Sequence, residues 1–194
     1  MLKKTYDTLD SALMKGVNTG VRAWNWTTGK TKADLANLTF GTGCALFTTG
    51  GFSNRVFPGF FYAAVSLPQI PLKYAENMDM ERREMKAMEN SCKDTDVELA
   101  KKFNAKVGHI QTLAGLSLGM SEVVTEPTKI GALTTDAGLV LMGMSHHVMR
   151  AEYLPPRKHC LARGFDKLKD ALKQYAPQPQ PIPVRNIMAE QFLQ

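Results

Sequence analysis

The chain alternates between charged segments and two apolar tracts rich in Gly and Thr, Leu35–Leu72 and Gly108–Met149. Near the start, apolar positions recur every three or four residues, which predicts an amphipathic helix over residues 2–26. The same periodicity returns near the end and predicts a last amphipathic helix over residues 158–175. The two stripes are Leu2, Tyr6, Leu9, Leu13, Val17, Val21 and Trp24, and Leu161, Phe165, Leu168, Leu172 and Tyr175.

The first apolar tract predicts a helical hairpin over residues 32–72. Thr31-x-x-Asp34 resembles a capping box, so we expect a helix to begin near Lys32. Gly50-Gly51 predicts the turn of the hairpin, and Pro68 with Pro71 predicts its end. Because Thr, Phe and Val are frequent in this tract, β-strands are the alternative.

Between the tracts, residues 73–107 carry interleaved charges and predict a solvated helix that is broken around Asn90–Asp96. Thr95-x-x-Glu98 matches a capping box that restarts the helix. Residues 108–150 predict a second apolar hairpin, with its turn at Thr125–Thr128. The prediction is therefore a mainly α chain, with one helical domain over residues 1–175.

The last segment, residues 176–194, is rich in proline, and we expect it to form an extended tail. The net charge of +6 lies at the two ends of the chain. Six basic and two acidic residues occupy positions 1–32, and eight basic and four acidic residues occupy positions 150–194. Basic ends fit anionic lipid, nucleic acid or an acidic protein. The densest aromatic cluster, Phe57 to Tyr62, lies in an apolar tract and not among lysines, which disfavours nucleic acid.

The apolar tracts raise the question of a membrane. Ile130–Met149 is the best candidate for a spanning helix, although it contains Asp136, whose insertion costs about 3 kcal/mol. Glycines in both tracts would allow close helix packing in lipid. We therefore expect transmembrane helices in a membrane protein that faces the inner or cytoplasmic side. The start, MLKKTYDTLD, has no apolar region and predicts no secretory signal.

The reactive residue types form no recognisable site. Cys44, Cys92 and Cys160 are far apart and predict neither a disulfide framework nor a zinc site. Gly29-Lys30-Thr31 resembles the end of a phosphate-binding loop, but the pattern lacks its first glycine. Adjacent side chains on a helix point about 100° apart, so His146 and His147 are interpreted as structural or interfacial histidines. The sequence thus nominates no catalytic, cofactor-binding or metal-binding residue, and no cofactor.

These patterns predict a non-enzymatic accessory or structural subunit of a larger, membrane-associated protein assembly. Its expected partners are other protein subunits and membrane lipid; nucleic acid is not expected, and the sequence says nothing of a small-molecule substrate. The alternative is a soluble α-helical binding module that uses its basic termini on nucleic acid or on an acidic protein partner.

Overall fold

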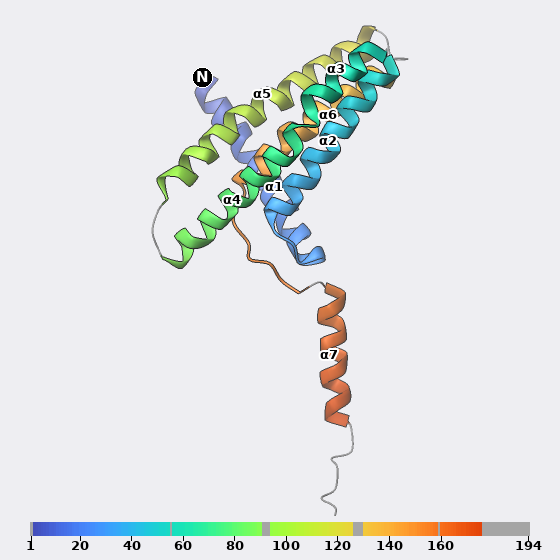
Figure 1. Ribbon diagram of the computed structural model, residues 1–194. Helices are drawn as coiled ribbons and strands as arrows, with labels where there is room; N and C mark the ends of the chain where they lie inside the picture. Colours follow the sequence, from blue (N-terminus) through green and yellow to red (C-terminus); the bar gives the residue numbers. More distant parts are fainter. Residues whose placement is uncertain (1, 55, 91–93, 126–129, 159, 176–194) are drawn as a thin grey trace, which may run out of the picture. The chain divides into compact units, whose positions relative to one another are not determined.

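The computed structural model describes residues 2–54, 56–90, 94–125, 130–158 and 160–175, and these ranges are almost entirely helical (Figure 1). They contain no strand, so the prediction of a mainly α chain is confirmed and β structure is excluded for the described residues. The helices are α1 (Leu2–Thr28), α2 (Lys32–Asn54), α3 (Val56–Ser66), α4 (Gln69–Glu89), α5 (Thr95–Thr125), α6 (Ile130–Arg150) and α7 (Cys160–Tyr175).

The chain forms two compact units, Met1–Cys160 and Leu161–Gln194. This division falls inside the range 1–175 that the sequence assigned to one domain. The second unit contains nearly all of α7, an amphipathic helix whose Phe165 and Leu168 are exposed. The predicted extended tail, residues 176–194, lies outside the described residues.

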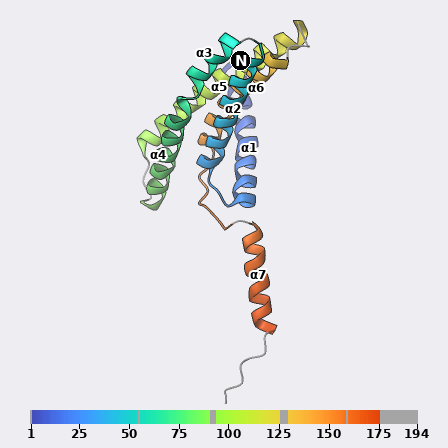
Figure 2. The same cartoon turned by 45° about the vertical axis from the view of Figure 1, so that its right-hand side comes forward.

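Within the first unit, α6 is the central helix. It packs along α2 on one side and along α5 on the other. After α2 the chain folds back as α3 and continues into α4, and both of these helices contact α2 (Figure 1). Helix α1 lies beside α2 and α6 (Figure 2). A small apolar core joins α1, α2, α4 and α6 and includes Val21, Ala33, Ala36, Met80, Val148 and Met149.

Glycines make the closest contacts of α6. A Cβ atom at Gly43 of α2 would lie 2.8 Å from the carbonyl oxygen of Gly138 in α6. On the other side of α6, a Cβ atom at Gly143 would lie 2.9 Å from the carbonyl oxygen of Gly108 in α5. Because no side chain separates these backbones, the three helices approach more closely than larger residues would permit.

The prediction of a turn at Gly50-Gly51 is wrong. Both glycines lie inside α2, which continues to Asn54. A Cβ atom at Gly50 would collide with the α6 backbone at Gly131, and one at Gly51 would collide with the ring of Tyr62 in α3. Their role is therefore close packing on both sides of α2, and the hairpin reverses after Asn54 instead.

The two predicted capping boxes have different outcomes. Helix α2 begins at Lys32, and the backbone N–H of Thr31 donates to the Asp34 carboxylate at 3.1 Å, as predicted. The box predicted at Thr95 is wrong, because the capping residue of α5 is Asp94. Its Oδ1 atom accepts hydrogen bonds from the backbone N–H groups of Asp96 and Val97, at 2.9 and 3.3 Å.

The expectation of transmembrane helices is also wrong. Among the described residues, none of the helices combines the length and the apolar character needed to cross a bilayer. The best candidate by sequence coincides with α6, which instead packs Asp136, His146 and His147 against neighbouring helices. Helix α5 runs across the predicted boundary at residue 107, so the start of the second apolar tract shares a helix with charged residues.

Many large apolar side chains lie on the outside of the first unit, most clearly along α5. This helix buries Asn104, Gly108 and Gly115 against its neighbours. Its large apolar residues point outward, and Leu99, Phe103, Ile110, Leu113 and Met120 are between 58% and 71% exposed. Contiguous exposure of this kind marks an interaction surface more often than a free one.

Two neighbouring glycines of α2 test the close packing. We expect Gly43→Ala to lower the free energy of unfolding by about 1–3 kcal/mol, because the added methyl group meets α6 backbone atoms at 2.8 Å. Nothing lies within 4 Å of a Cβ atom at Gly41, so Gly41→Ala is the matched control. It should raise the free energy of unfolding by about 1 kcal/mol through helix propensity. Denaturant unfolding monitored by circular dichroism measures both, and equal effects would contradict the packing.

Candidate binding groove

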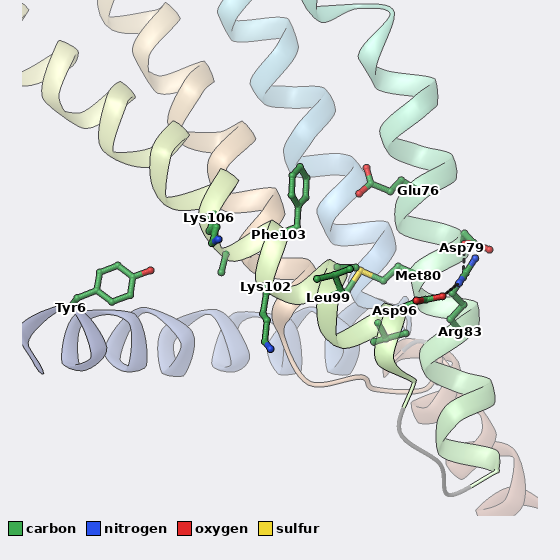
Figure 3. A pocket seen from close by; sticks show the side chains of 13 residues that line it. Tyr6, Glu76, Asp79, Met80, Arg83, Asp96, Leu99, Lys102, Phe103 and Lys106 are labelled. Atoms are coloured by element: carbon green, nitrogen blue, oxygen red, sulfur yellow. Dashed lines mark hydrogen bonds and ion pairs between the residues drawn. The ribbon is translucent and has the colours of Figure 1, made fainter. Parts of the chain in front are cut away.

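A groove with a volume of about 880 Å³ lies between α4 and α5 (Figure 3). Helices α4 and α5 draw apart along this groove (Figure 3). Tyr6 of α1 lines the groove at its far end. The other lining residues are Glu76, Asp79, Met80, Arg83, Asp96, Val97, Leu99, Ala100, Lys102, Phe103, Ala105 and Lys106.

Apolar side chains line the inside of the groove. Met80 of α4 and Val97 of α5 are buried, and Ala100 lies beside them, half-buried. Leu99 and Phe103 stand at the opening and are 68% and 58% exposed. The groove therefore offers two large, exposed apolar side chains beside a buried apolar inner surface.

The two rims of the groove carry opposite charge. Glu76 and Asp79 lie on α4, and Lys102 and Lys106 lie on α5 (Figure 3). Near the turn, Arg83 joins the helices: its guanidinium group donates to Asp79 at 2.9 Å and to Asp96 at 3.1 Å. These exposed ion pairs contribute little to stability, but they bridge α4 and α5 at one end of the groove.

Behind the groove lies a buried group of charges. The Lys32 ammonium group is 0% exposed and contacts Glu84 of α4 at 2.6 Å. It also donates to the carbonyl oxygens of Met149 and Ala151, at 3.1 and 2.6 Å. Glu84 in turn pairs with Lys101 of α5 at 2.8 Å. Burial lowers the pKa of Lys32, and the Glu84 carboxylate opposes this shift.

A second carboxyl group, Glu81, lies one turn before Glu84 on α4. Its Oε2 atom accepts a hydrogen bond from the Thr31 hydroxyl group at 2.8 Å. Burial raises the pKa of Glu81, while this hydrogen bond and the nearby Lys32 oppose the shift. The start of α2 is thus bound to α4 through two adjacent polar contacts.

His146 of α6 belongs to a polar network that also includes Lys73 and Glu76 of α4 and Asn104 of α5. One of its ring nitrogens, Nδ1, lies 2.7 Å from Oδ1 of Asn104 in α5. The Lys73 ammonium group donates to the same oxygen at 3.4 Å and to Glu76 on the groove rim at 3.0 Å. Burial, with a contribution from the charge of Lys73, lowers the pKa of His146 to about 3. Because the ring is neutral near pH 7, it serves as a donor to Asn104 and not as a cation.

His147 points to a different cluster, in which α1 meets α5 and α6. Asp10 of α1 accepts two hydrogen bonds from Arg150, at 2.7 and 2.8 Å, and lies 3.2 Å from the ring of His109. The rings of His109 and His147 meet edge to face, with centroids 4.7 Å apart. Burial lowers the pKa of His147 to about 4, and hydrogen bonding to Arg150 lowers the pKa of Asp10.

The structure therefore brings together histidines that sequence spacing left separate. His109 and His147 are far apart in the chain, and only the packing of α5 on α6 makes them neighbours. In the described residues, no group of three or more His, Cys, Asp or Glu side chains is arranged to hold a metal ion. Cys44 is buried, and burial raises the pKa of its thiol to about 11, which disfavours the reactive thiolate.

The Gly29-Lys30-Thr31 segment is a connection between helices. Gly29 ends α1 with a φ of 75°, a conformation that favours glycine, and its N–H donates to the Asn25 carbonyl oxygen at 2.9 Å. Thr31 then caps α2. The Asn25 side chain donates to the carbonyl oxygens of Lys30 and Pro155, at 3.0 and 2.9 Å. This segment thus holds the chain that follows α6.

No protein-family description, curated protein or solved structure matches the chain.

Buried and exposed ion pairs give the first test of this region. We expect Lys32→Met to lower the free energy of unfolding by about 3–5 kcal/mol, because it leaves Glu84 and two helix-end carbonyl groups buried without the ammonium group. The matched control is Arg83→Met, which removes exposed ion pairs and should change the free energy of unfolding far less. Urea unfolding of both variants measures the difference, and similar losses would show that the Lys32 contacts are not stabilising.

The buried histidines predict how stability depends on pH. Their pKa values in the fold, about 3 and about 4, lie below the unfolded value of 6.5. Below pH 6.5 the unfolded chain binds more protons, so stability falls as the pH is lowered to about 4. The slope should approach about 1.4 kcal/mol per pH unit for each histidine. Asp10, whose pKa is also lowered, adds a further loss below pH 3.8.

The variant His146→Asn separates the titration of the His146 ring from the titration of Asp and Glu side chains. An asparagine amide can still donate toward Asn104 but does not titrate, so the slope between pH 6.5 and 4 should be clearly shallower than in the parent chain. Unfolding midpoints measured across this range give the slope directly. An unchanged slope would mean that His146 does not titrate with folding.

Proposed function

We propose that the chain is a non-enzymatic helical binding module of a protein assembly, and that its α4–α5 groove takes an amphipathic helix of a partner protein. One observation carries this proposal: an open groove of about 880 Å³ has an apolar inner surface between rims of opposite charge. Grooves of this kind bind helices that insert their apolar stripe.

The charged rims define the chemistry of the partner helix. Lys102 and Lys106 on α5 favour acidic residues along one edge of the stripe. Glu76 and Asp79 on α4 favour basic residues along the other edge. Complementary charges of this kind fix orientation and exclude helices with the reverse pattern.

The exposed apolar residues supply the driving force. Burying Leu99 and Phe103 removes their apolar surface from water, which stabilises a complex by roughly 25 cal/mol per Å². Phe103 stands at the opening next to the buried Val97 and Met80, where an aromatic side chain can anchor the contact. We therefore expect Phe103 to contribute more to binding than the charged rims.

This proposal narrows the two hypotheses drawn from the sequence. It keeps a protein partner, but it requires a helix with one acidic and one basic edge, and it places the contact in a groove and not at the basic termini. The basic excess of the C-terminal end lies in residues 150–175, and the Pro-rich tail, residues 176–194, lies outside the described residues. Binding of the termini to lipid or nucleic acid stays a prediction.

A synthetic peptide tests the groove. The probe is a fluorescent amphipathic peptide with a leucine stripe, glutamates along one edge and lysines along the other, and the reference is a peptide of the same composition in scrambled order. We expect saturable anisotropy with the patterned peptide. Phe103→Glu should weaken this binding at least about tenfold, since it places a charge where the peptide buries its stripe.

Charge variants provide the matched control. Lys102→Glu/Lys106→Glu should also weaken the patterned peptide, whereas Lys15→Glu/Lys86→Glu makes the same change in net charge at exposed positions outside the groove. The proposal fails if both double variants bind alike, or if the scrambled peptide binds as tightly as the patterned one. Circular dichroism confirms that each variant is folded.

A further inference from the structure

The first unit has a second apolar surface, between α5 and α6, on a part of α5 that does not line the α4–α5 groove. It contains a groove of about 650 Å³. At its base, Gly115 brings α5 so close to α6 that a Cβ atom there would lie 2.7 Å from the Asp136 carbonyl oxygen. The lining residues are Gly115, Leu116, Gly119, Met120, Leu133, Asp136, Ala137, Val140 and Leu141.

A ridge of apolar side chains runs along α5 directly beside this groove. Ile110, Leu113 and Met120 are 69%, 62% and 71% exposed, and their spacings of three and seven residues place them on one stripe. Leu116 and Met120 also form one wall of the groove. The ridge and the groove together form the neutral face of the first unit.

The neutral face carries almost no charge. In α5 the described side chains from Ile110 to Ser121 include no Asp, Glu, Lys or Arg. Among the residues that line the groove, only Asp136 has an ionisable side chain, and it is 6% exposed.

We propose that the neutral face binds a second copy of this chain in a two-fold symmetric dimer. In such a dimer, the ridge formed by Ile110, Leu113 and Met120 of each copy lies in the α5–α6 groove of the other copy, so the surface is complementary to itself. The chain has a net charge of +6, so two copies repel each other in general. A face without exposed charge is where that repulsion opposes association least.

An antiparallel contact between two α5 helices would keep like charges apart. If two α5 helices cross near Gly115, Lys106 of each copy lies about 14 Å along the axis from the crossing, on opposite sides. The lysines of the two copies are then separated by well over the screening length of about 8 Å at physiological salt. A parallel arrangement would place the same lysines next to each other.

Sedimentation of the full chain over a range of concentrations tests this proposal. We expect a reversible dimer, and Leu113→Glu or Met120→Glu should weaken it at least about tenfold, because each places a charge in the apolar contact. Leu99→Glu is the matched control: it makes the same change on an exposed leucine of α5 outside the neutral face. It should leave the dimer intact while it weakens the patterned peptide.

The crossed result separates this proposal from the peptide-binding function. Loss of the dimer with retained peptide binding in Met120→Glu supports two independent surfaces. A parent chain that is monomeric at all concentrations overturns the dimer, whatever the peptide does. A dimer that Leu99→Glu dissociates and Met120→Glu does not would place the contact in the α4–α5 groove and also overturn the proposal.

Discussion

The arrangement of the first unit depends on the placement of one ammonium group. Lys32, the first residue of α2, reaches both the last carbonyl groups of α6 and the Glu84 carboxylate of α4. A buried ammonium group is costly without partners, so these three segments are stable only when they come together. Because Glu84 also binds Lys101 of α5, the same contacts fix the place from which α4 and α5 diverge. The groove is a consequence of that divergence.

The sequence predicted the helices better than their ends and contacts. Local patterns were sufficient for the mainly α class and for the start of α2 at Lys32, since apolar spacing and the Thr31–Asp34 pair act within a few residues. The turn predicted at Gly50-Gly51 was wrong because glycine occurs both in turns and at close helix contacts. Only the positions of the neighbouring helices show that these two glycines make close contacts. The membrane prediction failed for a related reason. Small residues and apolar tracts suit lipid, but here they let α2, α5 and α6 approach one another.

The candidate site was largely hidden from sequence analysis. Its rims come from α4 and α5. The interleaved charges of residues 73–107 predict a solvated helix, and only the packing of the chain shows that the two helices face each other. The exposed positions of Leu99 and Phe103 gave no signal, because an apolar stripe looks the same whether it faces a core or a partner. One clue was available: α5 has glycines and an asparagine on one face and large apolar residues on the other, the reverse of the usual arrangement.

That reversed face has a consequence for how this protein changes over time. At Gly108 and Gly115 the α5 backbone itself packs against α6, so substitutions at these positions act on the fold. The large apolar residues outside are exposed, so the fold itself depends little on them. Under the two proposals above, folding and association are encoded in separate sets of positions on one helix. A change of partner would then require substitutions at Leu99, Phe103, Leu113 or Met120 and no new core.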